Sequence, residues 1–461
     1  MSIRRTPGAA CVLASVLACV ILASSAEAGV SRLRRMVVVG DSLLAGFGSG
    51  GFVGAGRPGQ VDSAPAFVAR RAHVKLPLPL MSDPGVPAQL GIVDANRNGQ
   101  LDPGEVRRQD SGLGFRDDPE ARARNLAVPG EDMVSVFQTI SPQDIAGQLV
   151  SGSPNGRDIL KFLVLGLPLQ SDPVSQLSRA RDIAPSFLLV WLGNNDVLDM
   201  ATNTDPGAAT LGANDFGNRF RGLLDALADT RAGMAVANLP DPTGIAALRR
   251  AAGEVTSCHK ADGTMQAVAS DDLLSIDLDR SLLPTPPCGK VLDAAERAQV
   301  RATVIAFNAE IAAAIADTEQ RRGVSIASVD TFAAFDQLQA AGVDLDGNGT
   351  PDLTTRYLGG IFSLDGIHPT RTGNAIIANA FIDAINARFG EAIPRVDVAR
   401  VAARDRLAHS RFRPAGEPPF GLIGDGQSDD IESFFTHEFD NVQNGINDIR
   451  DKLEHRLGDF F

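Results

Sequence analysis

Residues 36–50 read MVVVGDSLLAGFGSG. The apolar run over 36–39 stops at Gly40, and Asp-Ser-Leu follows at once. This pattern predicts a buried parallel β-strand that ends in a tight turn and presents Ser42 at the carboxyl edge of a sheet, where open α/β folds place their ligands. Gly-Asp-Ser is also ordinary turn chemistry, and the G-x-S-x-G signature of another strand–turn–helix nucleophile is absent. Ser42 therefore needs partners before it can be assigned a role.

Further short apolar runs, each bounded by turn residues, predict more strands, and segments with helical periodicity lie between or after them. The predicted strands are 36–39, 125–128, 187–192, 234–239 and 324–329, and the clearest helical segments are 218–228, 294–320 and 372–389. Strands that alternate with helices require right-handed crossovers and a mostly parallel sheet covered on both faces. The sequence therefore predicts an α/β fold, a three-layer α/β/α sandwich.

Two regions interrupt this alternation within a main domain expected over residues 29–394. Residues 50–120 are rich in Gly, Pro, Asp and Arg, and residues 240–292 carry a cysteine pair, so both are expected to be loop-rich insertions on the strand ends. Residues 395–461 are expected to form a linker and then a charged amphipathic helix over 431–461, whose apolar residues follow helical spacing. Docking on the domain or on a partner is favoured for this helix over membrane anchoring.

The composition excludes one class of partner. The chain has 461 residues, of which 44% are hydrophobic and 21% charged, so it can bury a large core. The formal net charge is −13 and no stripe of Lys and Arg is visible, whereas binding to nucleic-acid phosphates needs clustered basic residues. We therefore expect no nucleic-acid partner.

The N-terminal residues predict the compartment. Two arginines form a positive n-region, residues 11–23 form an apolar h-region, and Ala-Glu-Ala at 26–28 is a small-residue cleavage site, so residues 1–28 are expected to be a secretory signal peptide. A lipoprotein attached at Cys19 is the alternative. The apolar run is too short for a permanent span, and no transmembrane span is expected in the mature chain. The protein is therefore expected to be secreted or periplasmic.

Removing the signal peptide leaves two cysteines, Cys258 and Cys288. In an oxidising compartment an isolated pair usually forms a disulfide. This disulfide would close a loop of about thirty residues and stabilise a poorly structured insertion by roughly 3 kcal/mol. Two free thiols are the alternative.

One of the six histidines stands in a functional context. Residues 363–370 read SLDGIHPT, so Asp365 lies three residues before His368. Within one turn, that spacing lets a carboxylate reach one ring nitrogen while the other faces outward, as the general base of a nucleophile requires. A surface turn with a solvated histidine is the alternative.

Two more segments end predicted strands with groups that can donate to an oxyanion. Residues 191–196 read WLGNND and place Asn195 at a strand end, where its amide could donate a hydrogen bond worth roughly 3 kcal/mol in acyl transfer. Residues 125–130 read NLAVPG, and a free N–H at Gly130 would be a second donor. A turn that caps the next helix is the alternative for the first segment, and a simple turn for the second.

These four segments, taken in order, resemble the SGNH or GDSL hydrolase family of esterases and lipases. The matching residues are GDSL at 40–43, NLAVPG at 125–130, GNND at 193–196 and DGIHPT at 365–370. The resemblance covers most of the expected domain and leaves the terminal segment unexplained. It implies a flavodoxin-like sandwich with a parallel sheet of about five strands, in agreement with the alternation.

The family pattern also implies roles for individual residues. Ser42 would be the nucleophile, His368 its base and Asp365 the orienting partner, with an oxyanion hole formed by the N–H groups of Ser42 and Gly130 and the side chain of Asn195. The substrate would be an ester of a lipid, a small molecule or a polysaccharide, cleaved through an acyl-enzyme with no cofactor for catalysis.

Several alternatives remain open at this point. The same catalytic residues would serve a polysaccharide O-acetyl esterase or an acyltransferase. A protein of a different class, a non-catalytic surface or binding protein stapled by calcium, could also use the fold. The sequence gives no indication of the oligomeric state.

Two stretches have the spacing of calcium-binding loops. Residues 94–105 read DANRNGQLDPGE and match D-x-N-x-N-G-x5-E at every position. Residues 344–352 read DLDGNGTPD and repeat the first nine positions, but Thr355 stands where the bidentate carboxylate belongs. Surface turns are the alternative for both. The candidate ligands of structural calcium are Asp94, Asn96, Asn98, Asp102 and Glu105 in the first loop and Asp344, Asp346, Asn348 and Asp352 in the second.

Overall fold

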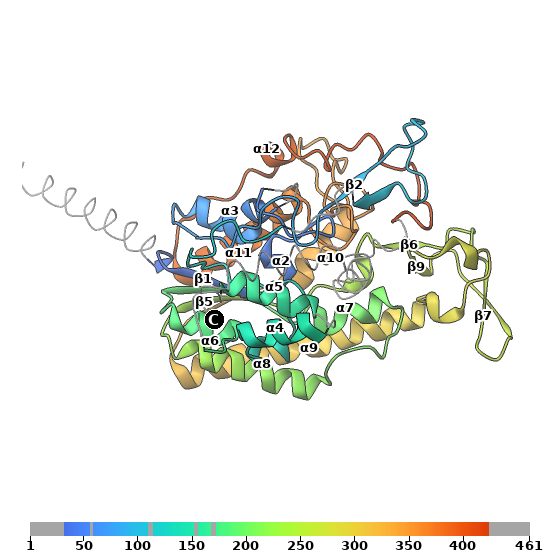
Figure 1. The fold of residues 1–461 in the computed structure, drawn as a ribbon. Helices are drawn as coiled ribbons and strands as arrows, with labels where there is room; N and C mark the ends of the chain where they lie inside the picture. The colour runs from blue at the N-terminus through green and yellow to red at the C-terminus, as the bar shows by residue number, and fades with distance from the viewer. Residues whose placement is uncertain (1–31, 56–58, 109–113, 152–154, 167–171, 424–461) are drawn as a thin grey trace, which may run out of the picture.

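The central sheet of the computed structural model contains four buried parallel strands (Figure 1). They pair in the order β1 (Met36–Gly40), β4 (Phe187–Trp191), β5 (Gly233–Ala237) and β10 (Ile326–Val329). Continuous apolar runs of this kind suit strands that are covered on both faces. The structure describes residues 32–55, 59–108, 114–151, 155–166 and 172–423. The predicted signal peptide (1–28) and amphipathic helix (431–461) lie outside these residues.

A fifth row of backbone lies along the other side of β1. Leu126 N donates to Val38 O at 3.0 Å and Val128 N to Gly40 O at 3.0 Å, both in the parallel sense. The strand expected over 125–128 is nevertheless only an isolated bridge. Leu126 O, which would accept from Gly40 N if the ladder continued, instead accepts a hydrogen bond from the side chain of Gln176 at 2.8 Å. With this row included, the order across the sheet is 125–128, β1, β4, β5 and β10. The row that comes second in the chain therefore lies at the edge, next to the first strand, as in a flavodoxin-like sheet.

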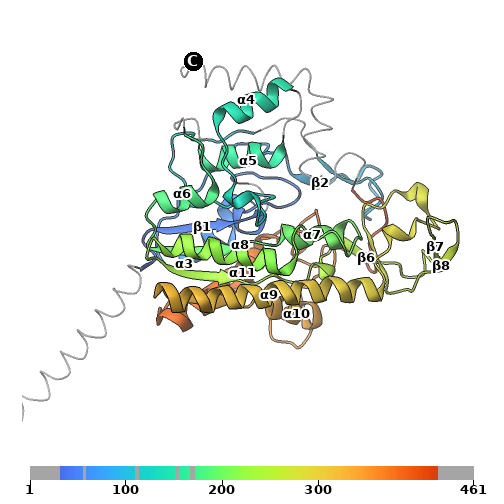
Figure 2. The ribbon, with the colours of Figure 1, turned by 90° about the horizontal axis from the view of Figure 1, so that it is seen from below.

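Helices cover both faces of the sheet, which confirms the predicted α/β sandwich (Figures 1 and 2). On one face α3 (Ala64–Arg71) packs against α11 (Arg371–Phe389), and on the other α6 (Gln176–Asp182), α8 (Ala213–Ala228) and α9 (Ala294–Arg322) pack together. The shorter helices are α2 (Ser42–Ala45), α4 (Pro142–Ser151), α5 (Gly156–Leu165), α7 (Asn195–Thr202), α10 (Thr331–Ala341) and α12 (Val398–Ala402), and 3₁₀ turns include η2 (Ser135–Phe137) and η4 (Pro242–Gly244).

The long helices agree with the periodicity, with one difference. Helix α8 begins five residues before the expected start at 218, and Gly217, which interrupts the sequence pattern, lies inside it. A Cβ at Gly217 would collide with the side chain of Glu310 on α9. The glycine therefore permits close packing of the two helices instead of ending one of them.

Helix α9 has a property that the sequence did not lead us to expect. By length and composition alone it could cross a membrane, which is weak evidence for a span because core helices pass the same test. One face of it is buried through side chains that recur at helical spacing, namely Val300, Val304, Phe307 and Ile311. In this structure α9 is thus a helix of the α/β core.

Both predicted insertions contain short antiparallel hairpins. The first holds β2 (Leu90–Ile92) and β3 (Val106–Arg108). The second holds β6 (Leu248–Arg250) paired with β9 (Leu273–Ser275), and β7 (Ser257–His259) paired with β8 (Met265–Ala267).

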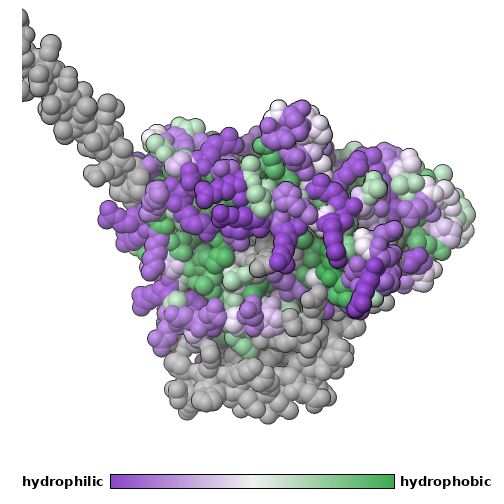
Figure 3. Space-filling view, turned by 90° about the horizontal axis from the view of Figure 1, so that it is seen from above, coloured by the Kyte–Doolittle hydropathy of each residue, from purple (hydrophilic) through white to green (hydrophobic). Residues whose placement is uncertain are grey.

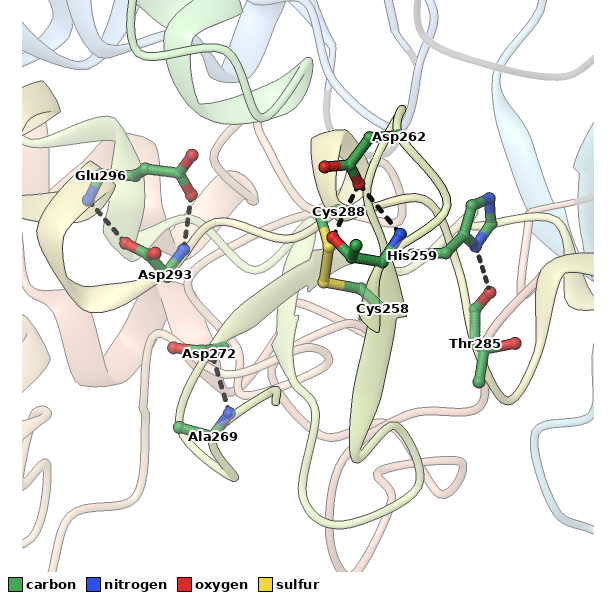
Figure 4. The surroundings of a disulfide bond; sticks show 10 residues. Cys258, His259, Asp262, Ala269, Asp272, Thr285, Cys288, Asp293 and Glu296 are labelled. Atoms are coloured by element: carbon green, nitrogen blue, oxygen red, sulfur yellow. Dashed lines mark hydrogen bonds between the residues drawn. A yellow bond between two sulfur atoms is a disulfide. The ribbon is translucent and has the colours of Figure 1, made fainter. Parts of the chain in front are cut away.

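The disulfide expected between Cys258 and Cys288 is present beside these hairpins (Figure 4). Around it lies a small apolar cluster, separate from the main core, that includes Val255, Leu274 and Phe420. The second insertion and Phe420 of the C-terminal segment therefore share a small apolar core beside the disulfide.

The described part of the C-terminal segment lies against the domain, where a linker was expected. Its side chains Phe420, Leu422 and Ile423 are buried. Leu422 N donates to Ile276 O of the second insertion, and Ile423 bridges to Val106 of the first. Burial of these apolar side chains favours packing over an extended chain. Seen from above, the coloured surface of the molecule is mainly hydrophilic, with scattered apolar patches (Figure 3).

Candidate active site

Ser42 lies where the sequence predicts, at the carboxyl end of β1 and at the first position of α2. Gly40 permits the close approach of β1 to β4 at this end, because a Cβ there would lie 2.9 Å from Trp191 O. Asp41 caps α2, since its Oδ1 accepts a hydrogen bond from Leu43 N at 3.0 Å. Ser42 is thereby held at the edge of the sheet, and only 7% of the residue is exposed.

Asp365 and His368 form a hydrogen-bonded pair in the loop before α11. His368 Nδ1 lies 3.1 Å from Asp365 Oδ2. The buried carboxylate also accepts hydrogen bonds from the backbone N–H groups of Gly50, Ile367 and His368 at 2.6–2.9 Å and from Ser363 Oγ at 3.1 Å. Burial by itself would raise the pKa of Asp365, but the charge of His368 and these hydrogen bonds outweigh it and lower the pKa below its ordinary value. The pair is arranged to keep a carboxylate behind the imidazole.

The loop that follows Ser42 is fastened to the loop that carries His368. Ser49 N donates to Ser363 Oγ at 2.7 Å, and the ring of Phe47 packs on the imidazole of His368 with 4.7 Å between ring centroids. Two segments more than three hundred residues apart in sequence therefore meet at one edge of the sheet, as a nucleophile and its base require.

The groups predicted to hold an oxyanion lie on three neighbouring segments. The N–H groups of Ser42 and Gly130 make no hydrogen bond to any residue within the described ranges, and Gly130 has a φ of +79°. Asn195 begins α7, and its Nδ2 donates to Glu131 O at 2.7 Å. A carboxamide has two N–H donors, so this bond orients the group and leaves one hydrogen for a ligand.

Two buried carboxyl groups beside these residues were not singled out from the sequence. Burial raises the pKa of Asp41 to about 6, against hydrogen bonds that include one from Asn194 Nδ2 at 2.8 Å. Burial also raises the pKa of Asp196 to about 7, although Met133 N donates to its Oδ2 at 3.0 Å. Asp41 directly follows an apolar strand, which is a signal that could have identified it, whereas Asp196 follows Gly-Asn-Asn and carries no such signal.

The two predicted calcium loops differ in geometry. In the second loop, oxygens of Asp344, Asp346 and Asp352 all lie within 4.8 Å of one another, a spacing that fits a cation. These three residues are exposed. The charge, oxygen donors and spacing of this set suit calcium.

In the first loop, Asp102 Oδ2 instead accepts hydrogen bonds from Asn96 and Asn98, each at 2.7 Å. The carboxylate of Glu105 is buried and accepts two backbone hydrogen bonds, whereas Asp94 Oδ1 is buried without a hydrogen-bond partner in the described residues. Both asparagine side chains therefore point their N–H groups at Asp102. To bind calcium in this loop, each amide would have to rotate so that its oxygen faces the metal.

Comparisons with known proteins extend over most of the domain. The family model described as GDSL-like Lipase/Acylhydrolase matches residues 36–381. No curated protein matches the chain. Two chains of solved structures match it, and one is an alpha/beta hydrolase enzyme from the metagenome of Lake Arreo, Spain. That structure is 14% identical to this chain and covers 76% of it, with 94% of its own chain matched and a TM-score of 0.32.

Proposed function

The chain belongs to the GDSL-like lipase/acylhydrolase family, and from that premise we propose that it is a serine esterase or lipase. Membership makes it a hydrolase. The observation that carries the finer proposal is the buried hydrogen bond between Asp365 and His368, on a loop fastened directly to the loop after Ser42. A nucleophile, a base and an orienting carboxylate on separate segments are the parts that acyl transfer to serine needs.

The proposed mechanism uses these residues in two half-reactions. Asp365 holds the Nδ1–H of His368, so that Nε2 accepts the proton of Ser42 Oγ as the oxygen attacks the ester carbonyl carbon. The N–H groups of Ser42 and Gly130 and the amide of Asn195 stabilise the oxyanion of the tetrahedral intermediate. His368 then protonates the leaving alcohol. In the second half-reaction it removes a proton from water, which attacks the acyl carbon, and it returns that proton to Ser42 Oγ as the bond to the acyl group breaks and the acid is released.

The irregular insertions bear on which ester is cleaved. The first reaches the catalytic carboxylate through Gly50 N, and the second reaches the His368 loop through Ala247, whose N–H donates to Gly366 O. A lipid ester, an ester of a small molecule and an O-acetylated polysaccharide remain the candidates, with acyl transfer as the alternative reaction. A non-catalytic binding protein is disfavoured, because five hydrogen bonds on a buried carboxylate have no evident purpose without the histidine chemistry.

We also propose that the protein acts outside the cytoplasm. A cleavable signal peptide is predicted over 1–28, and the bond between Cys258 and Cys288 supports an oxidising compartment. Structural calcium at the Asp344 loop is a further proposal, supported by its three clustered carboxylates. A cation there would neutralise their mutual repulsion and tie the loop together.

The experiment that tests the enzymatic proposal is active-site labelling. The wild-type protein should react covalently with a fluorophosphonate, and Ser42→Ala should abolish the reaction while keeping its thermal unfolding curve. A panel of p-nitrophenyl esters of increasing chain length, run beside acetylated sugars, then separates the substrate classes. Absence of labelling in folded wild-type protein, or equal labelling of Ser42→Ala, would disprove a catalytic Ser42.

A further inference from the structure

Two adjacent acidic residues follow Gly130, and each forms an ion pair with helix α5. Glu131 Oε1 lies 2.9 Å from Lys161 Nζ, and Asp132 Oδ2 lies 2.9 Å from an Arg157 guanidinium nitrogen. Arg157 and Lys161 are four residues apart and therefore share one face of α5. The outer pair is partly exposed, whereas the side chains of Glu131 and Lys161 are 0% and 1% exposed.

The ammonium group of Lys161 contacts the loop at more than one point. Besides Glu131, Lys161 Nζ donates to Ser135 O at 2.6 Å and contacts Gln138 O at 3.4 Å. Apart from the ion pair, neither carboxylate oxygen of Glu131 has a hydrogen-bond partner among the described residues. Lys161 is thus what holds the Glu131 side chain in place, and it draws both ends of the 131–138 loop toward α5.

Stability alone does not account for this pair. Burying two charges costs several kcal/mol per ion, and a well-packed apolar pair in the same space is often at least as stable. The mechanism proposed above gives neither side chain a chemical role. The position of the pair in the fold is therefore the informative feature.

The backbone that the pair holds is the backbone of the proposed oxyanion hole. Glu131 O accepts the hydrogen bond of Asn195 Nδ2 at 2.7 Å, and the preceding residue, Gly130, supplies the N–H donor. The stem of Arg157 lies next to Gly130, 3.7 Å from where a Cβ would stand. One short stretch of chain thus carries one donor and orients another.

We propose that Lys161 is a positioning residue of the oxyanion hole. Through Glu131 it fixes the 130–131 backbone, and so places the Gly130 N–H and the Asn195 amide for the developing oxyanion. Lys161 does not touch the substrate. The inference rests on the proposed function, and it goes beyond it by assigning a role to an ion pair outside the catalytic motifs.

The test compares turnover with the binding of a boronic acid. A boronate forms a tetrahedral adduct with a catalytic serine, and one of its oxygens occupies the oxyanion hole. Lys161→Met should lower kcat roughly 10- to 100-fold, as small misplacements of catalytic groups do, and should weaken boronate binding by the same factor. KM should change by less than about threefold, because the carbonyl oxygen of the uncharged ester gains much less from the oxyanion hole than the developing oxyanion does.

Two further variants separate positioning from folding. Lys161→Met leaves a buried carboxylate without its cation, so the double variant Glu131→Gln/Lys161→Met should regain stability but not boronate affinity. Arg249→Met is the matched control. It removes another cation whose side chain is 0% exposed, paired with the more exposed Glu254 in the second insertion. It should lose stability while keeping wild-type affinity for a boronate without an acyl chain.

The outcomes are distinguishable from failure of the proposed function. If the wild type does not bind the boronate, or Ser42→Ala binds it equally, the esterase proposal is wrong and this inference falls with it. If the wild type binds through Ser42 but Lys161→Met binds as tightly, only the positioning role is overturned. Full recovery of boronate affinity in the double variant, or an equal loss in Arg249→Met, would overturn it too.

Discussion

The carbonyl oxygen of Gly366 accepts a hydrogen bond from the N–H of Ala247 at 2.9 Å. This contact joins the loop of His368 to the second insertion. Gly366 has a φ of +72°, and a Cβ there would lie 2.5 Å from Ala247 N. The catalytic loop and the insertion are therefore packed too closely at this point for any side chain.

Gly366→Ala is expected to lower both stability and activity. The left-handed conformation alone costs an alanine roughly 1–2 kcal/mol, and the collision with Ala247 would add displacement of the His368 loop. Thermal unfolding and kcat/KM on a p-nitrophenyl ester measure the two effects. Gly263→Ala is the matched control, because Gly263 has a φ of +82° with nothing within 4 Å of its Cβ position. Unchanged kcat/KM in folded Gly366→Ala would contradict this coupling.

Asp365→Asn is expected to inactivate the enzyme with little change in shape. An amide cannot hold the Nδ1–H tautomer of His368 as a carboxylate does, and the same replacement in a serine protease lowers kcat roughly 10⁴-fold. We expect a loss of at least about 10³-fold here, measured as kcat/KM and as the rate of fluorophosphonate labelling. A loss of less than about tenfold would show that another group orients the imidazole.

The sequence predicted the parts of the site that depend on short local sequence patterns. Ser42, Asn195 and the Asp365–His368 pair each depend on a turn directly after a strand or before a helix, and such turns have recognisable residues. The alternation of apolar runs likewise predicted the sheet and its main helices. These features depend on neighbours in sequence.

The features that were missed depend on contacts between distant segments. Glu131 and Lys161 carry no local pattern that marks them as a buried pair, and only the packing of α5 brings them together. The row at 125–128 has the composition of a strand, but the carbonyl oxygen of Leu126 accepts a hydrogen bond from the distant side chain of Gln176 instead of continuing the ladder. The packing of Phe420 on the insertion could not be inferred for the same reason.

The buried carboxyl groups predict an unusual pH dependence of stability. Asp196 has a pKa raised by burial to about 7, whereas an ordinary aspartate titrates near 3.8. Between these values the folded chain binds a proton that the unfolded chain has lost, so the free energy of unfolding falls as pH rises through this window. Once the pH exceeds 7, the total free energy of unfolding lost through Asp196, relative to acid pH, is on the order of 4 kcal/mol.

Asp196→Asn tests this directly. The amide keeps an oxygen for Met133 N and cannot ionise, so the variant should lose less stability than the wild type between pH 5 and pH 8. Urea unfolding at the two pH values measures the difference. Asp182→Asn, which changes an exposed carboxylate on α6, should behave as the wild type. Parallel pH profiles of wild type and Asp196→Asn would contradict the assigned pKa.

The disulfide variant Cys258→Ser/Cys288→Ser is expected to destabilise the second insertion. The bond spans a sequence separation of 30 residues, and closing a loop of that length contributes roughly 3 kcal/mol. The insertion meets the His368 loop through Ala247, so loosening it should alter the preference for acyl-chain length more than the rate of fluorophosphonate labelling. If the labelling rate fell as much as the chain-length preference changed, the insertion would be needed to position the catalytic residues themselves.

Calcium removal should lower the melting temperature and spare the catalytic chemistry. Asp344, Asp346 and Asp352 repel one another when no cation is bound, and a ligand at one hundred times its Kd stabilises the folded state by about 2.7 kcal/mol. The melting temperature in excess calcium should therefore exceed that in excess EGTA by about 3 °C or more. Asp344→Asn/Asp352→Asn should melt alike in both, with labelling of Ser42 intact, because the loop is not part of the Asp365–His368 pair. Identical wild-type curves in calcium and EGTA would mean that the loop is a surface turn, held by its own hydrogen bonds such as Gly349 N to Asp344 Oδ2 at 2.7 Å.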